Sequence, residues 1–249
     1  MSAGEMRPLP SRQELPKALT GSAFLDYAVH LSRRHGFLYV VNPKVGCSSI
    51  LWTLQRLEAQ DADREPSRVG VIHDRQASPL LAPSDIGASA ELLRGEEFFK
   101  FTFVRNPFDR LLSCFLNKIS RPTVQRQLLL AQMGRPKDSE YEIELAEFVA
   151  AIGGQALEDM DPHWRPQWAQ TLQGHARYDA IGRFERFDQE LLRIGERISP
   201  QFEDYVHREV RQATGPKPYH LITPAVAEQV RELYGRDFTE FQYALEVPA

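Results

Sequence analysis

The sequence predicts an α/β protein with a central parallel sheet flanked by helices. Three observations support this fold class. Short, continuously apolar and β-rich runs are typical of strands that are buried on both faces. These runs alternate along the chain with segments in which apolar residues recur at helical spacing. Polar loops that contain glycine or arginine follow the strands, at the ends where open α/β sheets bind their ligands.

Length and composition fit one globular domain. The chain has 249 residues, of which 42% are hydrophobic and 26% charged. We expect a poorly ordered arm over residues 1–20 and a single domain over residues 21–249. A net charge of −4 argues against nucleic-acid binding, so any anion site has to be local. Two cysteines and no long apolar run near the N-terminus predict a cytoplasmic protein without a membrane span.

The first elements form a strand, a loop and a helix. Residues 22–34 predict a helix, because apolar side chains recur there every three or four positions. The apolar run 37–41 predicts a buried strand, which ends at Asn42 and the proline after it. Beyond the loop 44–49, apolar positions at helical spacing predict a helix over 50–59.

The middle of the chain contains two further predicted strands. Residues 68–72 form a short β-rich run that ends at His73. Residues 98–104 form a longer one, and a proline shortly afterwards fits the first position of an amphipathic helix over 107–119. The pattern over 121–140 is ambiguous, and we interpret this segment as a mobile insert.

The last part of the chain repeats the alternation. A predicted helix over 142–152 ends at two glycines, and a polar loop over 161–167 follows. A fourth strand is predicted over 178–184, with a helix over 188–198 behind it. The tail contains a helix over 224–234, whose apolar residues are spaced for burial on one side.

The loop Lys44-Val45-Gly46-Cys47-Ser48-Ser49 lies between a buried strand and the start of a helix. The unpaired backbone N–H groups and the dipole of a helix N-terminus favour an anion there. Gly46 allows a close backbone approach, two serines offer hydroxyl donors, and Lys44 offers a cation. The loop therefore suits a phosphate or phosphosulfate, although a simple strand-to-helix turn is the alternative. It is not a Walker A loop, because the order Gly-x-x-x-x-Gly-Lys-Ser/Thr is absent.

Cys47 raises a second hypothesis, since a thiol at a helix N-terminus can have a lowered pKa and act as a nucleophile. A phosphatase-like loop of that kind also needs an arginine shortly afterwards. Thr53 stands at that place, which makes the nucleophile the weaker interpretation.

A second motif, Arg105-Asn106-Pro107-Phe108-Asp109-Arg110, follows the third predicted strand, with Ser113 on the helix behind it. Arginine at a strand end presents a planar fork of donors to a phosphate, and a serine hydroxyl one or two turns into the helix adds another. The alternative is a surface salt bridge between Arg105 and Asp109.

In this order, the two motifs resemble the 5′-phosphosulfate loop and the 3′-phosphate motif of the carbohydrate sulfotransferases that include the chondroitin 4-O and HNK-1 enzymes. Later segments resemble that family too: Asp161-Pro-His-Trp-Arg-Pro-Gln, Tyr178-Asp-Ala-Ile-Gly, and Leu233-Tyr234 with Asp237-Phe238 and Phe241. The resemblance implies a P-loop-like three-layer sandwich. It also implies transfer of a sulfuryl group from 3′-phosphoadenosine-5′-phosphosulfate (PAPS) to an acceptor hydroxyl on a carbohydrate, with 3′,5′-adenosine bisphosphate as the product and no metal.

The resemblance also implies roles for single residues. The residues that would hold the phosphosulfate are Lys44, Gly46, Cys47, Ser48 and Ser49. Those that would hold the 3′-phosphate are Arg105 and Ser113. The sequence departs from the animal enzymes in lacking their N-terminal anchor and many of their cysteines, and in having Gly46, Ser48 and Ser49 where Ala, Thr and Asn are more frequent. The identity of the acceptor is therefore open.

Sulfuryl transfer also needs a base and positive charge near the bridging oxygen. Lys44 suits the second task. Among the seven histidines, His73 ends a predicted strand, where related sulfotransferases often have a catalytic histidine. His163 is the alternative base. We expect His163, Trp164 and Arg165 to bind the acceptor, although packing of the loop is the alternative for the tryptophan.

Other readings remain open at this point. A basic stretch of Arg121, Arg126, Arg135 and Lys137 either contacts an anionic glycan or is a solvated surface. A P-loop-like kinase would share the fold and the way in which phosphate is bound. The sequence lacks the Gly-Lys-Ser/Thr order and a clear magnesium-binding acidic residue at a strand end, which argues against a kinase. A nucleotide-binding or glycan-binding protein without catalysis would need neither Lys44 nor a base.

Overall fold

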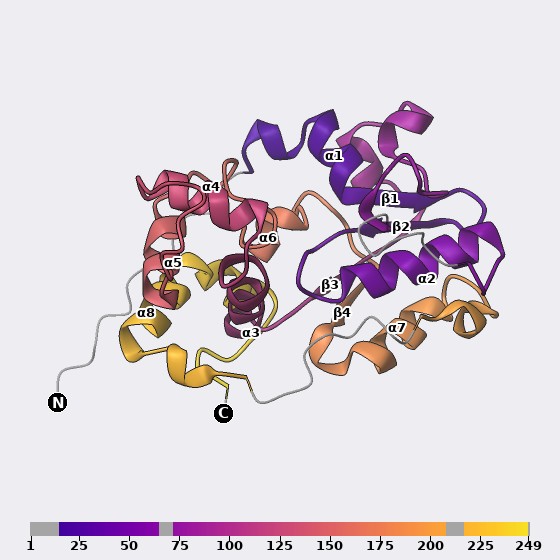
Figure 1. Ribbon diagram of the computed structural model, residues 1–249. Helices are drawn as coiled ribbons and strands as arrows, with labels where there is room; N and C mark the ends of the chain where they lie inside the picture. The colour runs from indigo at the N-terminus through magenta and orange to yellow at the C-terminus, as the bar shows by residue number, and fades with distance from the viewer. Residues whose placement is uncertain (1–14, 65–71, 208–216, 249) are drawn as a thin grey trace.

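The protein is an α/β structure built on a four-stranded sheet. Figure 1 shows the computed structural model, which describes residues 15–64, 72–207 and 217–248. The strands are β1 (Val29–Ser32), β2 (Phe37–Val40), β3 (Phe99–Val104) and β4 (Ala180–Arg183), and they lie side by side in this order. β1 is antiparallel to β2, whereas β2, β3 and β4 are mutually parallel. The predicted α/β class is confirmed, and the sheet is parallel as predicted except for β1.

Helices cover both faces of this sheet (Figure 1). On one face, α2 (Cys47–Ala59) and α7 (Phe187–Gly195) pack over side chains such as Tyr39 and Phe101. On the other face, Leu38 and Val40 pack with residues of α1 (Ser22–Ala28) and α6 (Gln167–Gln170). Neighbouring residues of β2 thus point into different cores, as the alternation of side chains along a strand requires. Apolar contact on both sides explains why β2 is apolar throughout.

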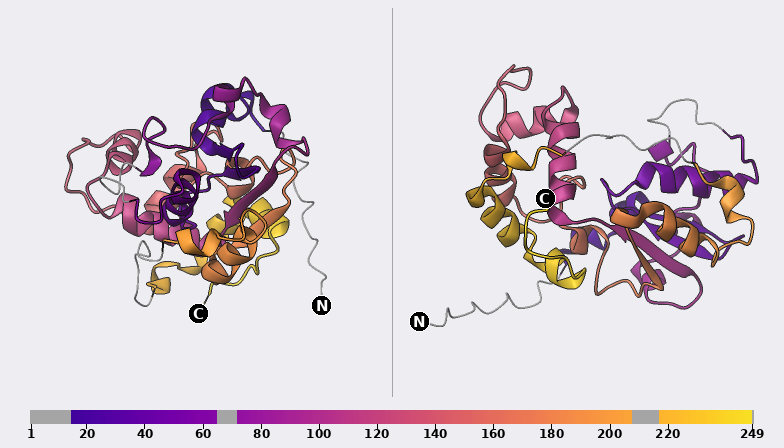
Figure 2. Two further views of the ribbon diagram at one scale, coloured as in Figure 1. Left: turned by 90° about the vertical axis from the view of Figure 1, so that its right-hand side faces the viewer. Right: turned by 90° about the horizontal axis from the view of Figure 1, so that it is seen from below.

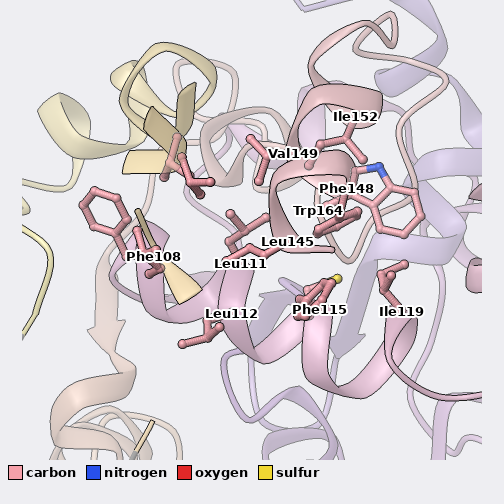
Figure 3. Packing of buried hydrophobic residues seen from close by; sticks show 14 of the residues in the cluster. Phe108, Leu111, Leu112, Phe115, Ile119, Leu145, Phe148, Val149, Ile152 and Trp164 are labelled. Atoms are coloured by element: carbon pink, nitrogen blue, oxygen red, sulfur yellow. The ribbon is translucent and has the colours of Figure 1, made fainter. Parts of the chain in front are cut away.

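A second group of helices continues from the end of β3 and lies beside the sheet (Figure 2). It consists of α3 (Pro107–Cys114), α4 (Val124–Gln132), α5 (Leu145–Gly153), α8 (Pro224–Leu233) and α9 (Gly235–Glu240). These helices share an apolar core of their own, in which Phe148 is fully buried (Figure 3). The sheet and the helical group therefore meet where β3 passes into α3.

The start of α3 follows the expected capping chemistry. Asn106 precedes the helix, and its side-chain oxygen accepts from the backbone N–H of Phe108 at 3.0 Å and of Asp109 at 3.4 Å. Pro107 occupies the first helical position, where its missing N–H costs nothing. At its other end, α3 passes into a π-helical turn, Phe115–Ile119.

The N-terminal part of the chain differs from the prediction. The helix expected over 22–34 ends at Ala28, and β1 follows. The reason is pairing on both sides: β1 joins β2, and the backbone of Leu31 also exchanges two hydrogen bonds with Leu81, at 2.9 and 3.0 Å. Tertiary pairing outweighs the helical spacing here. Leu15 and Leu19 are buried, so packing begins within the expected arm.

Residues 121–140 are not an irregular insert, because they contain α4. Thr123 caps this helix by accepting from the backbone N–H of Arg126 at 3.2 Å. The guanidinium of Arg126 donates to the carbonyls of Ile119 and Tyr141, which ties the helix to its flanking turns. The ambiguous sequence pattern arose because the apolar Val124 and Leu128 face outward.

The strand expected over 68–72 falls largely outside the described residues. Of its predicted end, Ile72 and His73 lie in a 3-10 turn. Among the described residues, no helix is both long enough and apolar enough to cross a membrane.

Candidate active site

The loop after β2 has a backbone shaped for close contact with a ligand. Lys44 and Gly46 both adopt left-handed conformations, with φ of 72° and 83°. A lysine at positive φ costs about 1 to 2 kcal/mol, and strain of this kind gathers at functional sites. Gly46 precedes α2 and has no side chain to cap it, so the N–H groups of the first turn are left for an anion.

Buried polar side chains hold this loop in place. The amide of Asn42 donates to the carbonyl of Phe103 and to Gln167 Oε1, both at 2.9 Å. Arg110 Nε donates to the carbonyl of Pro43 at 3.0 Å. The loop is therefore fixed to β3 and to the helices beside the sheet before any ligand binds.

Gly46→Ala is expected to lower the free energy of unfolding by about 2 to 4 kcal/mol, from left-handed strain plus overpacking. A Cβ at Gly46 would lie 2.5 Å from the ring of Phe187. Gly36 has a similar φ of 64° with open space around it, so Gly36→Ala is the matched control and should cost only about 1 kcal/mol. Urea unfolding measures both, and equal losses would show that the contact with Phe187 adds nothing.

Lys44 lies in the loop as a half-buried cation. Burial lowers its pKa to about 8, and the nearby charges of Lys118 and Arg105 act in the same direction. An anion bound at the loop would favour the protonated lysine. The site is thus prepared for negative charge that arrives with a ligand.

Cys47 does not have the properties of a nucleophile. Burial raises the pKa of its thiol above the ordinary value, although Lys44 opposes this rise. The thiolate is therefore disfavoured in the free protein, and the nucleophile hypothesis receives no support. Ser49 is buried, and its carbonyl accepts from Thr53 Oγ1 at 2.9 Å within the helix. Ser48 remains partly exposed in the first turn.

Arg105 is buried beside the same loop. Its Nη1 donates to the carbonyl of Lys44 at 3.1 Å, and its guanidinium lies 4.3 Å from the centre of the Phe184 ring. Its Nε is buried and has no hydrogen-bond partner among the described residues. Asp109 binds Lys217 and Tyr219 instead of forming the surface salt bridge with Arg105. An arginine with an open donor is suited to an oxyanion.

Ser113 lies in the last turn of α3 and is half-buried. Its carbonyl accepts from Asn117 Nδ2 at 3.1 Å. Arg105 therefore lies just before the N-terminus of α3, and Ser113 lies in its last turn. At the N-terminal end, the side chain of Arg105 contacts the loop of Lys44.

The two candidate bases lie in one neighbourhood. His73 Nε2 and Ser48 Oγ are 2.9 Å apart, so the exposed ring of His73 touches the start of α2. Desolvation lowers the pKa of His73, and the charges of His163 and Lys118 lower it further. The sequence therefore identified two histidines that the fold brings together, from segments far apart in the chain.

His163 is oriented by a carboxylate. Its Nδ1 lies 2.6 Å from Asp161 Oδ1, and because a carboxylate only accepts, Nδ1 carries the proton. Burial lowers the pKa of His163 in spite of this partner. Burial opposes the charge of Asp161, but the hydrogen bonds from His163 outweigh it, and the pKa of Asp161 ends below its ordinary value. The Asp-x-His spacing was the signal that could have identified this pair.

Trp164 and Arg165 are not available to an acceptor. The indole of Trp164 is buried edge-on against Phe148, 5.7 Å between ring centres, and its N–H donates to Gln155 at 2.8 Å (Figure 3). Arg165 is buried, and its guanidinium donates to the carbonyls of Leu157, Glu158 and Met160. Both side chains stabilise the loop that holds His163, so we do not retain their acceptor-binding role.

Two buried residues of the site have roles that sequence reasoning missed. Arg110 donates to the carbonyls of Pro43, Pro162 and Arg165, and so joins the lysine loop to the histidine loop. Gln167 exchanges hydrogen bonds with the backbone of Arg105, at 2.9 and 2.7 Å. The only sequence signal for either was a polar residue inside a segment that already resembled a known family.

A profile of the sulfotransferase family matches residues 28–244, which include the lysine loop, Arg105 and both histidines. The chain belongs to this sulfotransferase family. The match to human carbohydrate sulfotransferase 14 is 28% identical and covers 86% of this chain and 60% of the relative. Rat carbohydrate sulfotransferase 11 is 22% identical, with 85% and 65% covered, and human carbohydrate sulfotransferase 8 is 26% identical, with 86% and 56% covered. The predicted resemblance to carbohydrate sulfotransferases is confirmed.

Two qualifications of the prediction follow from these matches. The chain spans about three fifths of the length of human carbohydrate sulfotransferase 14. The expectation of a cytoplasmic protein is corrected, because animal carbohydrate sulfotransferases give that assignment no support. No solved structure matches the chain.

Proposed function

We propose that this sulfotransferase transfers a sulfuryl group from PAPS to a hydroxyl group of a carbohydrate, within one P-loop-like domain over residues 21–249. The observation that carries the proposal is the arrangement at the start of α2. There, Lys44 precedes the open N–H groups of the first turn by a few residues, and His73 Nε2 lies 2.9 Å from Ser48 Oγ in that turn. Family membership supports the same reaction.

Each group has a defined task in this proposal. The first turn of α2 and Lys44 bind the phosphosulfate, and Arg105 with Ser113 binds the 3′-phosphate. The acceptor oxygen attacks sulfur, the bond between sulfur and the 5′-phosphate oxygen breaks, and 3′,5′-adenosine bisphosphate leaves. His73 takes the proton of the acceptor hydroxyl, while Lys44 stabilises the negative charge on the departing phosphate.

No metal enters this proposal. The negative charge of the donor is met by side-chain cations and by helix N–H groups. In the parts of the chain that the structure describes, no three His, Cys, Asp or Glu side chains are grouped to hold a metal ion. Independence from metal remains a prediction, and assays with a chelator test it.

Product formation separates this function from its rivals. With radiolabelled PAPS and a panel of saccharides, glycolipids and small phenols, the sulfotransferase should label a saccharide without added metal. A kinase would instead require ATP and magnesium. A binding protein would retain nucleotide and turn nothing over, and either result would refute the proposal.

Arg105→Ala is expected to weaken binding of 3′,5′-adenosine bisphosphate about ten-fold to a hundred-fold, the value of one charged phosphate contact. Binding of 5′-AMP, which lacks the 3′-phosphate, should change little. Calorimetry on both nucleotides measures the difference. Arg177→Ala removes a guanidinium that only pairs with exposed Glu96, and it serves as the control. Equal affinity of the unaltered protein for the two nucleotides would remove the 3′-phosphate assignment.

A further inference from the structure

A cavity of about 460 Å³ opens between α1 and the turn that follows His73. Its walls carry several polar side chains: Asp26, Tyr27, Arg75, Gln76, Ser84 and Asp85. None of them has a task in the proposed donor site. The volume is sufficient for one or two sugar rings, within the usual range of ligand cavities.

The cavity adjoins the candidate active site. Arg75 is only two residues from His73, on the same turn, and its guanidinium contacts His30 Nδ1 on β1. Tyr27 is 42% exposed, yet its hydroxyl is desolvated and lies near enough to Cys47 and Asp161 for their charges to raise its pKa. The cavity therefore lies on the side of the molecule that carries His73 and Cys47, although neither of these residues lines it.

The two carboxylates on the walls are held in fixed positions. Asp26 Oδ1 accepts from the backbone N–H of Ser84 at 3.0 Å, and Asp85 Oδ2 accepts from that of Ala82 at 2.7 Å. In each case the second oxygen has no hydrogen-bond partner among the described residues. These carboxylate oxygens can accept hydrogen bonds from hydroxyl groups, and the side-chain amide of Gln76 can both donate and accept. The ring of Tyr27 offers an apolar face. This combination suits a hydroxyl-rich ring.

The charge of the cavity argues against an anionic ligand. Its walls carry two carboxylates and one guanidinium, and both carboxylates favour the protonated form of Arg75 against the effect of its burial. Arg75 Nη2 is buried and has no hydrogen-bond partner among the described residues, but the two carboxylates of the walls still leave the cavity net negative. A uronate or sulfate in the same space would meet net negative charge.

Basic residues that seemed able to bind an anionic glycan are engaged elsewhere. Arg126 donates to backbone carbonyls, and the guanidinium of Arg135 stacks at 3.5 Å on the ring of Tyr141. Arg165 is buried against carbonyls of its own loop. These three side chains are therefore committed to the fold.

We infer that this cavity binds the acceptor and selects an uncharged saccharide, with Asp26 and Asp85 hydrogen-bonding its hydroxyl groups. The inference rests on the proposed function. It adds that the sugar placed beside His73 carries no carboxylate or sulfate of its own. Asp26 and Asp85 are then specificity-determining residues, because they repel anionic acceptors as well as binding neutral ones.

The test compares a neutral tetrasaccharide of galactose and N-acetylglucosamine with a chondroitin tetrasaccharide, at one fixed PAPS concentration. We expect kcat/KM to favour the neutral acceptor at least about five-fold, the effect of about one unit of nearby charge. Asp26→Asn and Asp85→Asn keep the oxygen that accepts the backbone N–H but remove the charge. Each should reduce the preference about two- to five-fold. Asp204→Asn, an exposed charge on the 3-10 helix Phe202–Tyr205, should leave it unchanged.

Binding is measured separately from turnover, by calorimetry with each tetrasaccharide in the presence of 3′,5′-adenosine bisphosphate. Tyr27→Ala should weaken binding of the neutral tetrasaccharide at least about three-fold, because the ring face is lost. A preference for chondroitin that both asparagine variants leave unaltered would overturn the inference. Absence of sulfuryl transfer to any acceptor would refute the proposed function alone, because the binding experiment would still report on the cavity.

Discussion

His73→Ala should lower turnover with saturating PAPS and acceptor by at least about a hundred-fold, because general-base catalysis contributes about 10²- to 10⁴-fold. Binding of 3′,5′-adenosine bisphosphate should remain, since the proposed nucleotide contacts are made by other residues. The side chain is exposed, so its loss should not unfold the protein. Steady-state kinetics together with calorimetry on the same preparation measure both quantities.

His163→Ala is the matched comparison, because this histidine lies in the same neighbourhood and is oriented by Asp161. We expect a smaller loss of turnover than for His73→Ala. If His163→Ala abolishes turnover with nucleotide affinity intact, and His73→Ala stays nearly active, the base is His163. The pair with Asp161 would then explain how that base is oriented.

Lys44→Ala should lower kcat about 10²- to 10³-fold, the usual cost of removing one donor that meets charge developing in the transition state. Its effect on the KM for PAPS should be smaller, since the charge on the leaving phosphate grows as the reaction proceeds. Comparison of kcat with KM separates the two effects. Turnover within about two-fold of the unaltered protein would exclude Lys44 as the group that stabilises the leaving phosphate.

The same lysine sets the expected alkaline limit of activity. In the free enzyme its pKa is lowered to about 8, so kcat/KM for PAPS should fall as the pH rises through that value. If PAPS binds as proposed, its negative charge should raise the pKa of Lys44, so kcat should fall only at higher pH. The acidic limb should lie below the ordinary value of 6.5 for histidine, because His73 has a lowered pKa. In Lys44→Arg, which stays protonated, the alkaline limb should disappear.

The sequence predicted β2, β3, β4 and the loops that follow β2 and β3, because their signals are local. An apolar run such as 37–41 has few alternatives to a buried strand, and the loop after it begins a helix within a few residues of the expected position. The short strand β1 was missed because its stability comes from pairing with β2 and Leu81, which no local pattern encodes. The same limit explains α4, whose outward apolar residues gave a misleading pattern.

The site was predicted less completely than the fold. Residue type, position and the family resemblance singled out Lys44, Arg105 and both histidines as candidates, but did not show which polar groups hold them. Arg165 illustrates the difference. In the sequence it is a cation close to a histidine, whereas in the fold its guanidinium donates hydrogen bonds to backbone carbonyls. Whether a charged side chain binds a ligand or the protein itself depends on contacts between segments distant in the chain.

Arg110 has a consequence for the physical state of the unliganded enzyme. Its guanidinium is buried and donates to carbonyls of both the lysine loop and the histidine loop. It acts as an internal brace, so the separation between the donor side and the histidine side is set during folding. Ligand binding should then require little movement of the lysine loop and the histidine loop. The protein should therefore lose little conformational entropy in addition to the entropy that the reactants lose.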